Sequence, residues 1–131
     1  MLEIYKLYQT PEMGRAIHTL WNSPPEKFQP NTDEDHQRRM VSDFWNWLGW
    51  MLDEGLVDVD LIHRRFQNGV LVWEKLEPIE LAIRKRIERR DHAGWDDEKI
   101  NKAARQHVGN QPAAKLYVKW KQRYGHQQGL N

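Results

Sequence analysis

One stretch of this chain carries more apolar surface than a helix on the outside of a protein needs. At about 100° per residue, the apolar side chains of residues 41–52 cover roughly 220° of a helix, whereas a surface helix shows an apolar stripe of about 100°. Trp50 lies at one edge of this arc, beside Asp43 and Glu54 on the polar side. We therefore predict a central helix that other helices cover on two sides.

The rest of the chain also has the periodicity of helices, with no alternation typical of strands. Helix starts are indicated by Thr10, Thr32, Asp58 and Asp96, because each precedes a first turn that contains a proline or an acidic residue and then an apolar stripe. The pattern predicts helices over residues 2–9, 10–21, 32–54, 58–66, 70–90, 96–108 and 112–125. The expected fold is a single all-α domain, a bundle of six or seven helices over residues 1–125, with a frayed tail at 126–131.

Two features interrupt this pattern. Residues 22–31 contain three prolines, which predicts a loop, and Phe28 is its expected anchor in the core. Pro78 lies inside the long helix 70–90. It lacks a backbone donor and clashes with the carbonyl of Glu74, so we expect a kink there.

Composition excludes several classes of protein. The 131 residues include no cysteine, which rules out disulfides, cysteine zinc sites and a cysteine nucleophile. No apolar run approaches the roughly 20 residues of a membrane span, and the first eight residues are too polar for a signal peptide. We expect a soluble, cytoplasmic protein with no membrane contact, no cofactor and no evident small-molecule ligand.

The formal net charge of +1 is a cancellation between two halves. Residues 1–60 hold 5 basic and 11 acidic side chains, a net −6, whereas residues 61–131 hold 15 and 8, a net +7. Either the two halves attract each other within one domain, or the basic half faces a partner.

Several local features resemble a bacterial family of all-helical domains of unknown function. The aromatic helix ends in Gly55-Leu56-Val57-Asp58, a short helix runs to Phe66, and a Trp-Glu-x-Leu-x-Pro helix from Trp73 carries Arg84. The resemblance covers roughly residues 10–90. It implies an all-α fold and a bacterial or phage-like source. Relatives often follow N-terminal membrane helices, which this chain does not show, and the family implies no activity.

The tryptophans favour protein interaction as the function. Most of the seven are expected in the core, but Trp47 and above all Trp50 are candidates for contact with a partner or a second copy, because Trp is enriched at interface hot spots. We find no Gly-rich phosphate loop, serine nucleophile motif or dinucleotide fingerprint. The leading hypothesis is a non-enzymatic interaction or regulatory module.

The alternative hypothesis is nucleic-acid binding by the basic half. The densest basic run could track a phosphate backbone, although a solvated helix face explains it as well. Its candidate residues are Arg84, Lys85, Arg86, Arg89 and Arg90. Arg86 and His92 also resemble the Arg-x(4–6)-His pair of HEPN-type ribonucleases, in which the histidine acts in acid–base chemistry and the arginine stabilises phosphate charge.

Other polar residues are expected to be structural. The acids Asp53, Glu54, Asp58 and Asp60, with His63 nearby, lack the spacing of known metal motifs, and helix capping explains them better, so no metal site is predicted. Glu80 lies near an apolar helix face, where a carboxylate needs a partner. Its expected partner is Arg84, four residues further on.

Overall fold

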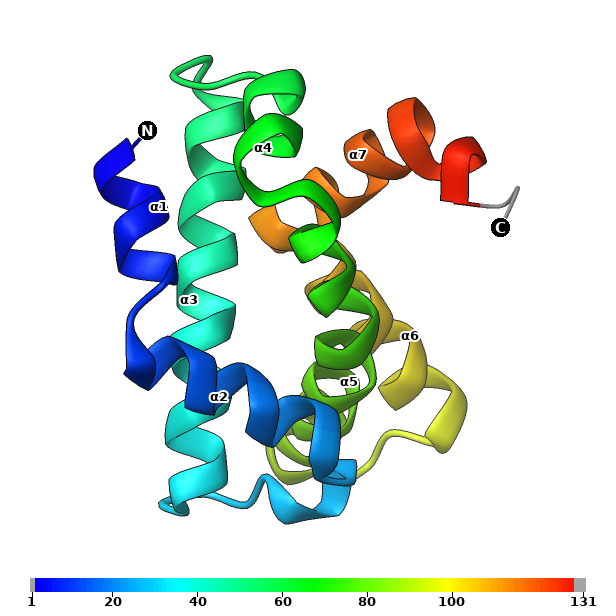
Figure 1. Ribbon diagram of the computed structural model, residues 1–131. Helices are drawn as coiled ribbons and strands as arrows, with labels where there is room; N and C mark the ends of the chain where they lie inside the picture. The colour runs from blue at the N-terminus through cyan, green and yellow to red at the C-terminus, as the bar shows by residue number, and fades with distance from the viewer. Residues whose placement is uncertain (1, 129–131) are drawn as a thin grey trace.

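The computed structural model describes residues 2–128, and the side chains of residues 3–125. This part of the chain contains no strand and forms a single bundle of α-helices (Figure 1), which confirms the predicted fold class. The helices are α1 (Leu2–Tyr8), α2 (Pro11–Asn22), α3 (Asp33–Asp53), α4 (Val59–Phe66), α5 (Val72–Asp91), α6 (Asp97–Gly109) and α7 (Pro112–Gln128). Short 3-10 turns, η1 (Pro25–Lys27) and η2 (Gln67–Leu71), precede α3 and α5.

All four predicted helix starts are confirmed by their capping bonds. The side chains of Thr10, Thr32, Asp58 and Asp96 each accept a hydrogen bond from the backbone N–H three residues later, at 2.7–3.2 Å. Each bond satisfies one of the N–H groups that the first turn of a helix leaves without a partner.

The end of α3 is closed by Gly55. Its φ of +76° is the left-handed conformation in which only glycine is free of strain. The N–H of Gly55 donates to the carbonyl of Leu52 at 3.1 Å, and the N–H of Leu56 donates to the carbonyl of Met51 at 2.9 Å. These two bonds form a Schellman motif, so α3 stops at the predicted place.

The aromatic helix α3 lies at the centre of the bundle. It packs extensively against α2 on one side and α7 on the other, as predicted from its wide apolar arc. Trp45 and Leu48 are buried there. Rings of Tyr8, Phe44 and Phe66 meet Trp45 and one another with centroids 4.8–5.8 Å apart. Burial of these aromatic side chains supplies much of the hydrophobic core.

The prediction that most tryptophans are core residues is wrong. Trp45, Trp73 and Trp120 are buried, whereas four others are exposed. Trp21 illustrates the reason, because α2 buries the row of Met13, Ala16 and Leu20 and leaves Trp21 at the edge of the contact. The exposed tryptophans are Trp21, Trp47, Trp50 and Trp95.

The interruptions in the helical pattern fall near their predicted places. The loop after α2 contains η1, and Phe28 is fully buried as its anchor.

The helix α5 begins at Val72 rather than at residue 70, because η2 precedes it. This 3-10 turn begins at Gln67, whose φ is +50°. The helix continues through Pro78 to Asp91, so the kink stays a prediction. At the other end, α7 continues past the predicted start of the tail to Gln128, and residues 129–131 lie outside the described part.

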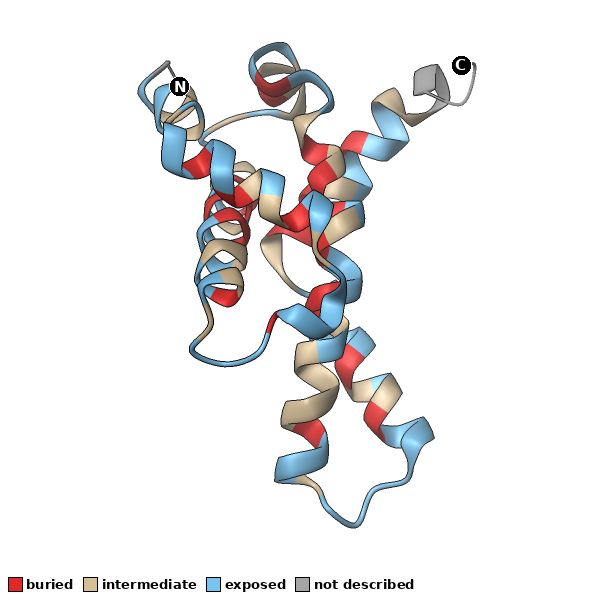
Figure 2. Ribbon diagram, turned by 60° about the horizontal axis from the view of Figure 1, so that its bottom comes forward, coloured by how far each residue is buried: buried red, intermediate tan, exposed pale blue. Residues whose placement is uncertain are grey.

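The hairpin of α5 and α6 projects from the rest of the bundle (Figure 2). Ile100 and Ala104 of α6 are buried, and so is the carboxylate of Glu88 on α5. That carboxylate accepts a hydrogen bond from Arg84 Nε at 2.9 Å.

Among the described residues, no helix combines the length and the hydrophobicity that a membrane-spanning segment needs.

Candidate protein-interaction surface

The second half of α3 and the start of α7 approach each other unusually closely. A Cβ atom on Gly49 would lie 2.2 Å from the backbone oxygen of Pro112, so the absence of a side chain permits this contact. Three residues earlier, Asn46 Oδ1 accepts a hydrogen bond from the backbone N–H of Ala113 at 2.9 Å. These two contacts fix where α7 leaves α3.

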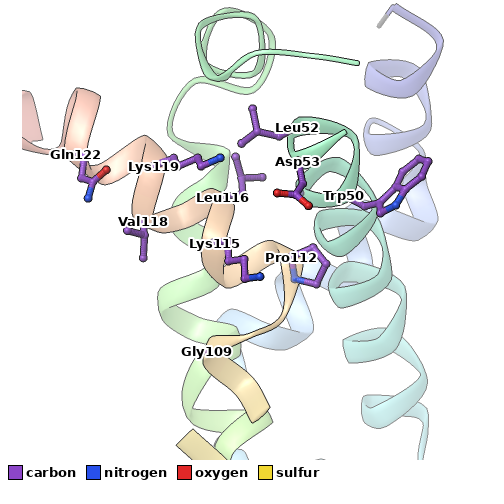
Figure 3. Close-up of a pocket in the computed structure, with 11 residues that line it drawn as sticks. Trp50, Leu52, Asp53, Gly109, Pro112, Lys115, Leu116, Val118, Lys119 and Gln122 are labelled. Carbon is purple, nitrogen blue, oxygen red and sulfur yellow. The ribbon is translucent and has the colours of Figure 1, made fainter. Parts of the chain in front are cut away.

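Beyond this crossing the two helices diverge and leave a groove of about 390 Å³ (Figure 3). Its apolar lining comes from Leu52 on α3 and from Pro112, Leu116 and Val118 at the start and middle of α7. Val118 is about half exposed, so this apolar surface faces solvent in the monomer. Exposed apolar surface in a concave place is typical of binding sites.

Trp50 forms the α3 edge of the groove. Its indole is directed away from α7 in Figure 3, and the residue is 48% exposed. Trp47, which is 41% exposed, lies about 60° away on the same side of the helix. Met40, seven residues before Trp47, is also exposed. Both tryptophans predicted to meet a partner therefore lie on one accessible face of α3.

The charged side chains of the groove are not neutralised within the described structure. Lys115 and Lys119 lie one turn apart on α7, and neither forms an ion pair there. Other cations on the same helix are paired: Lys121 Nζ lies 3.5 Å from Glu74 Oε2, and Arg123 binds Asp60. Asp53 lines the groove as a single carboxylate. Lys115 and Lys119 belong to the basic half of the chain, but no sequence pattern joins them to Trp50, because more than sixty residues separate them from it.

The candidate nucleic-acid residues do not form one continuous basic row. Arg84 binds Glu88 on its own helix, with 2.8 Å between Arg84 NH2 and Glu88 Oε1. Arg86 instead reaches the Pro-rich loop, where its guanidinium donates to the carbonyl of Phe28 at 3.1 Å and to Gln29 Oε1.

The other cations of this run diverge as well. Arg89 lies 3.8 Å from Asp97 of α6, and Arg90 binds its neighbour Asp91 at 3.1 Å. Lys85 forms no hydrogen bond or ion pair with described residues.

The ribonuclease-like pair is not assembled either. Arg86 is engaged with the loop, whereas the His92 ring stacks on Trp95 with centroids 3.8 Å apart. His92 Nε2 lies 3.4 Å from Glu88 Oε2. The two side chains therefore have different partners within the described residues.

Two of the four acids considered for a metal site, Asp58 and Asp60, have structural partners. Asp58 caps α4, and Asp60 accepts hydrogen bonds from Tyr124 Oη and Arg123 Nε. The bond from Tyr124, followed by that from Arg123, lowers the pKa of Asp60 below its ordinary value. His63 stacks on Tyr124 and accepts a hydrogen bond from Trp120 Nε1 at 3.0 Å. No group of three metal-ligating side chains occurs in the described part of the chain.

The predicted pair of Glu80 with Arg84 is wrong. Glu80 Oε1 accepts instead from Arg38 NH1 at 2.9 Å, and Arg38 Nε donates to Asp35 Oδ1 at 2.8 Å. Burial disfavours the charge on Arg38, but the hydrogen bonds to Asp35 and Glu80 outweigh it and raise the pKa of Arg38. Because Arg38 comes from α3, spacing along α5 could not reveal it.

No protein-family model, curated protein or solved structure matches the chain. The resemblance to a bacterial helical family therefore stays a prediction.

Proposed function

We propose that this protein is a non-enzymatic interaction module that binds an acidic, amphipathic helix of a partner protein in the groove between α3 and α7. The observation that supports this function is the pairing of unneutralised Lys115 and Lys119 with the exposed apolar residues Val118 and Trp50. A partner with apolar anchors and carboxylates on adjacent turns complements both properties. A cytoplasmic location belongs to this proposal as a prediction from the sequence.

The spacing of the groove residues favours a helical occupant. Lys115 and Lys119 are separated by one turn, about 6 Å along the axis, which matches carboxylates at positions i and i+4 of a partner helix. Because the Trp50 indole is directed away from α7, it would contact the part of a partner that extends past the α3 edge of the groove, where a large side chain of this kind contributes strongly to binding. The partner helix would lie across the groove with its apolar face toward Leu116 and Val118.

The proposal is tested with two synthetic helices as probes, a Leu/Glu amphipathic peptide and its Leu/Lys counterpart, titrated calorimetrically. We expect saturable binding of the acidic peptide and none of the basic one. The variant Lys115→Glu/Lys119→Glu should reverse this preference, because the groove then carries only acidic side chains. Lys102→Glu, on an exposed residue of α6 outside the groove, is the matched control and should bind like the parent.

The oligomeric state of the protein and of its Trp50 variants shows whether a second copy, rather than a partner helix, occupies the groove. We expect the parent to be a monomer by light scattering, with Trp50→Ala and Trp50→Glu weakening the acidic peptide. A parent dimer that Trp50→Glu converts to a monomer, together with no peptide binding, would assign the groove to self-association and overturn the proposal. Equal binding of both peptides would overturn it as well.

A further inference from the structure

A second hollow lies near the N-terminal end of α3, where this helix meets α5 and the Pro-rich loop. Its volume is about 450 Å³, and four of its lining residues are arginines. Arg38 and Arg39 come from α3, whereas Arg86 and Arg90 come from successive turns of α5. Two helices that are far apart in the sequence thus bring guanidinium groups to one place beside the Pro-rich loop, and we call it the arginine pocket.

The walls of the arginine pocket are preorganised. Arg86 holds the loop, since its NH2 donates to the Phe28 carbonyl at 3.1 Å and its NH1 donates to Gln29 Oε1. Arg38 is only 11% exposed and is fixed between Asp35 and Glu80. Ile83, Ile87 and Pro30 add an apolar part to the lining.

The charges of the pocket are only partly compensated. Asp35, which also lines the pocket, and Glu80 neutralise Arg38, and Asp35 Oδ2 lies 3.3 Å from the exposed Arg39. Arg90 is paired with its neighbour Asp91 at 3.1 Å. Arg86 differs, because both of its hydrogen-bond acceptors are uncharged and no carboxylate of the described residues lies within 4.0 Å of it. A guanidinium has about five N–H donors, so Arg86 keeps donors for a ligand after making its two bonds.

We propose that the arginine pocket binds the phosphate group of an organic phosphate, whose apolar portion rests on Ile83, Ile87 and Pro30. Planar guanidinium groups bind phosphate oxygens in pairs. Arg39, Arg86 and Arg90 approach from two helices, which suits the several acceptor oxygens of a phosphate better than the two of a carboxylate. This site is separate from the groove between α3 and α7 and does not depend on the function proposed for it.

The phosphate could belong to a small metabolite or to a nucleic-acid strand, and the test separates these sources. Phenyl phosphate, benzoate, inorganic phosphate and a single-stranded oligonucleotide are titrated at low ionic strength. We expect saturable binding of phenyl phosphate that is tighter than that of the other two small anions. Phenyl phosphate binding without oligonucleotide binding assigns the site to small organic phosphates. Displacement of a bound oligonucleotide by phenyl phosphate assigns it to a strand.

The variants Arg86→Gln and Arg90→Gln should each weaken the binding of phenyl phosphate by about tenfold, since each removes charge-assisted hydrogen bonds. Lys85→Gln changes the neighbouring cation of α5, which does not line the pocket, and should leave binding unchanged. Arg90→Gln keeps the proposal testable if loss of the loop contact unfolds Arg86→Gln. The proposal is wrong if phenyl phosphate shows no saturable binding, or if Lys85→Gln weakens it as much as Arg90→Gln.

Discussion

Asn46, in the middle of α3, caps the first turn of α7 through the 2.9 Å hydrogen bond that its Oδ1 accepts from the N–H of Ala113. A capping acceptor ordinarily comes from the residue that precedes the helix. Here it comes from a residue 67 positions earlier, so the start of α7 depends on its packing against α3.

Asn46→Ala should lower the free energy of unfolding by about 0.5–2 kcal/mol, the usual cost of losing a capping side chain. Urea denaturation measures this change. Asn46→Asp keeps the acceptor and puts a negative charge near the N-terminus of α7, where the helix dipole favours it. The aspartate variant should therefore be more stable than the alanine variant. Equal losses in both would show that the hydrogen bond is not the stabilising contact.

Gly49→Ala should destabilise the protein by about 1–3 kcal/mol or more, as expected of overpacking. The added methyl would lie 2.2 Å from the Pro112 oxygen, so α7 would have to move. Gly14→Ala is the matched control, because nothing lies within 4 Å of a Cβ at that exposed position in α2. That change should stabilise the protein by about 0.5–1 kcal/mol through helix propensity. Similar melting temperatures for the two variants would contradict the close approach of α3 and α7.

Arg38→Met should cost about 3–5 kcal/mol, because it leaves the buried carboxylate of Glu80 without a cation and that of Asp35 with only the exposed Arg39. Arg39→Met, one residue further on but 57% exposed, should change stability by no more than about 0.5 kcal/mol. Adding Asp35→Asn and Glu80→Gln to Arg38→Met should recover part of the loss, since no buried charge then remains. Chemical denaturation of the parent, the two single variants and the triple variant measures these changes. A triple variant that recovers none of the loss would show that the three charges do not stabilise one another.

The titration of Asp60 provides a pH-dependent prediction. Hydrogen bonds from Tyr124 and then Arg123 lower the pKa of Asp60 from its ordinary value of 3.8. The contribution of these hydrogen bonds to the free energy of unfolding is therefore present above pH 3.8. It is lost as the pH falls from that value through the lower pKa that Asp60 has in the folded protein. Carboxyl NMR shifts should show a midpoint below 3.8 that rises in Tyr124→Phe and in Arg123→Gln. A midpoint that neither variant moves would exclude these contacts in solution.

The helix starts could be predicted because their signals are local. The bond from the Asp96 side chain to the N–H of Lys99 joins residues three apart, so sequence alone contains both partners. The central position of α3 could be predicted for a similar reason, since the width of its apolar arc is a property of one segment.

The tertiary sites could not be predicted in this way. Arg38 binds Glu80 although 42 residues separate them, whereas the spacing along α5 offers Glu80 only Arg84. Arg38 and Arg39 belong to the acidic half of the chain. The net charge of that half therefore did not indicate that they line a pocket with Arg86. The groove combines Trp50, which the sequence indicated, with lysines of α7 whose proximity only the fold establishes.

The position of α3 between α2 and α7 has a consequence for synthesis on the ribosome. Residues 1–53 can emerge and pair α2 with α3 early, whereas α7 is translated after every helix that it covers. Until Leu116 and Trp120 have left the exit tunnel, the core lacks both side chains and the surface around Gly49 stays open to water. We therefore expect a nascent chain that pauses before residue 112 to expose apolar surface of its core, although its central helix is already complete.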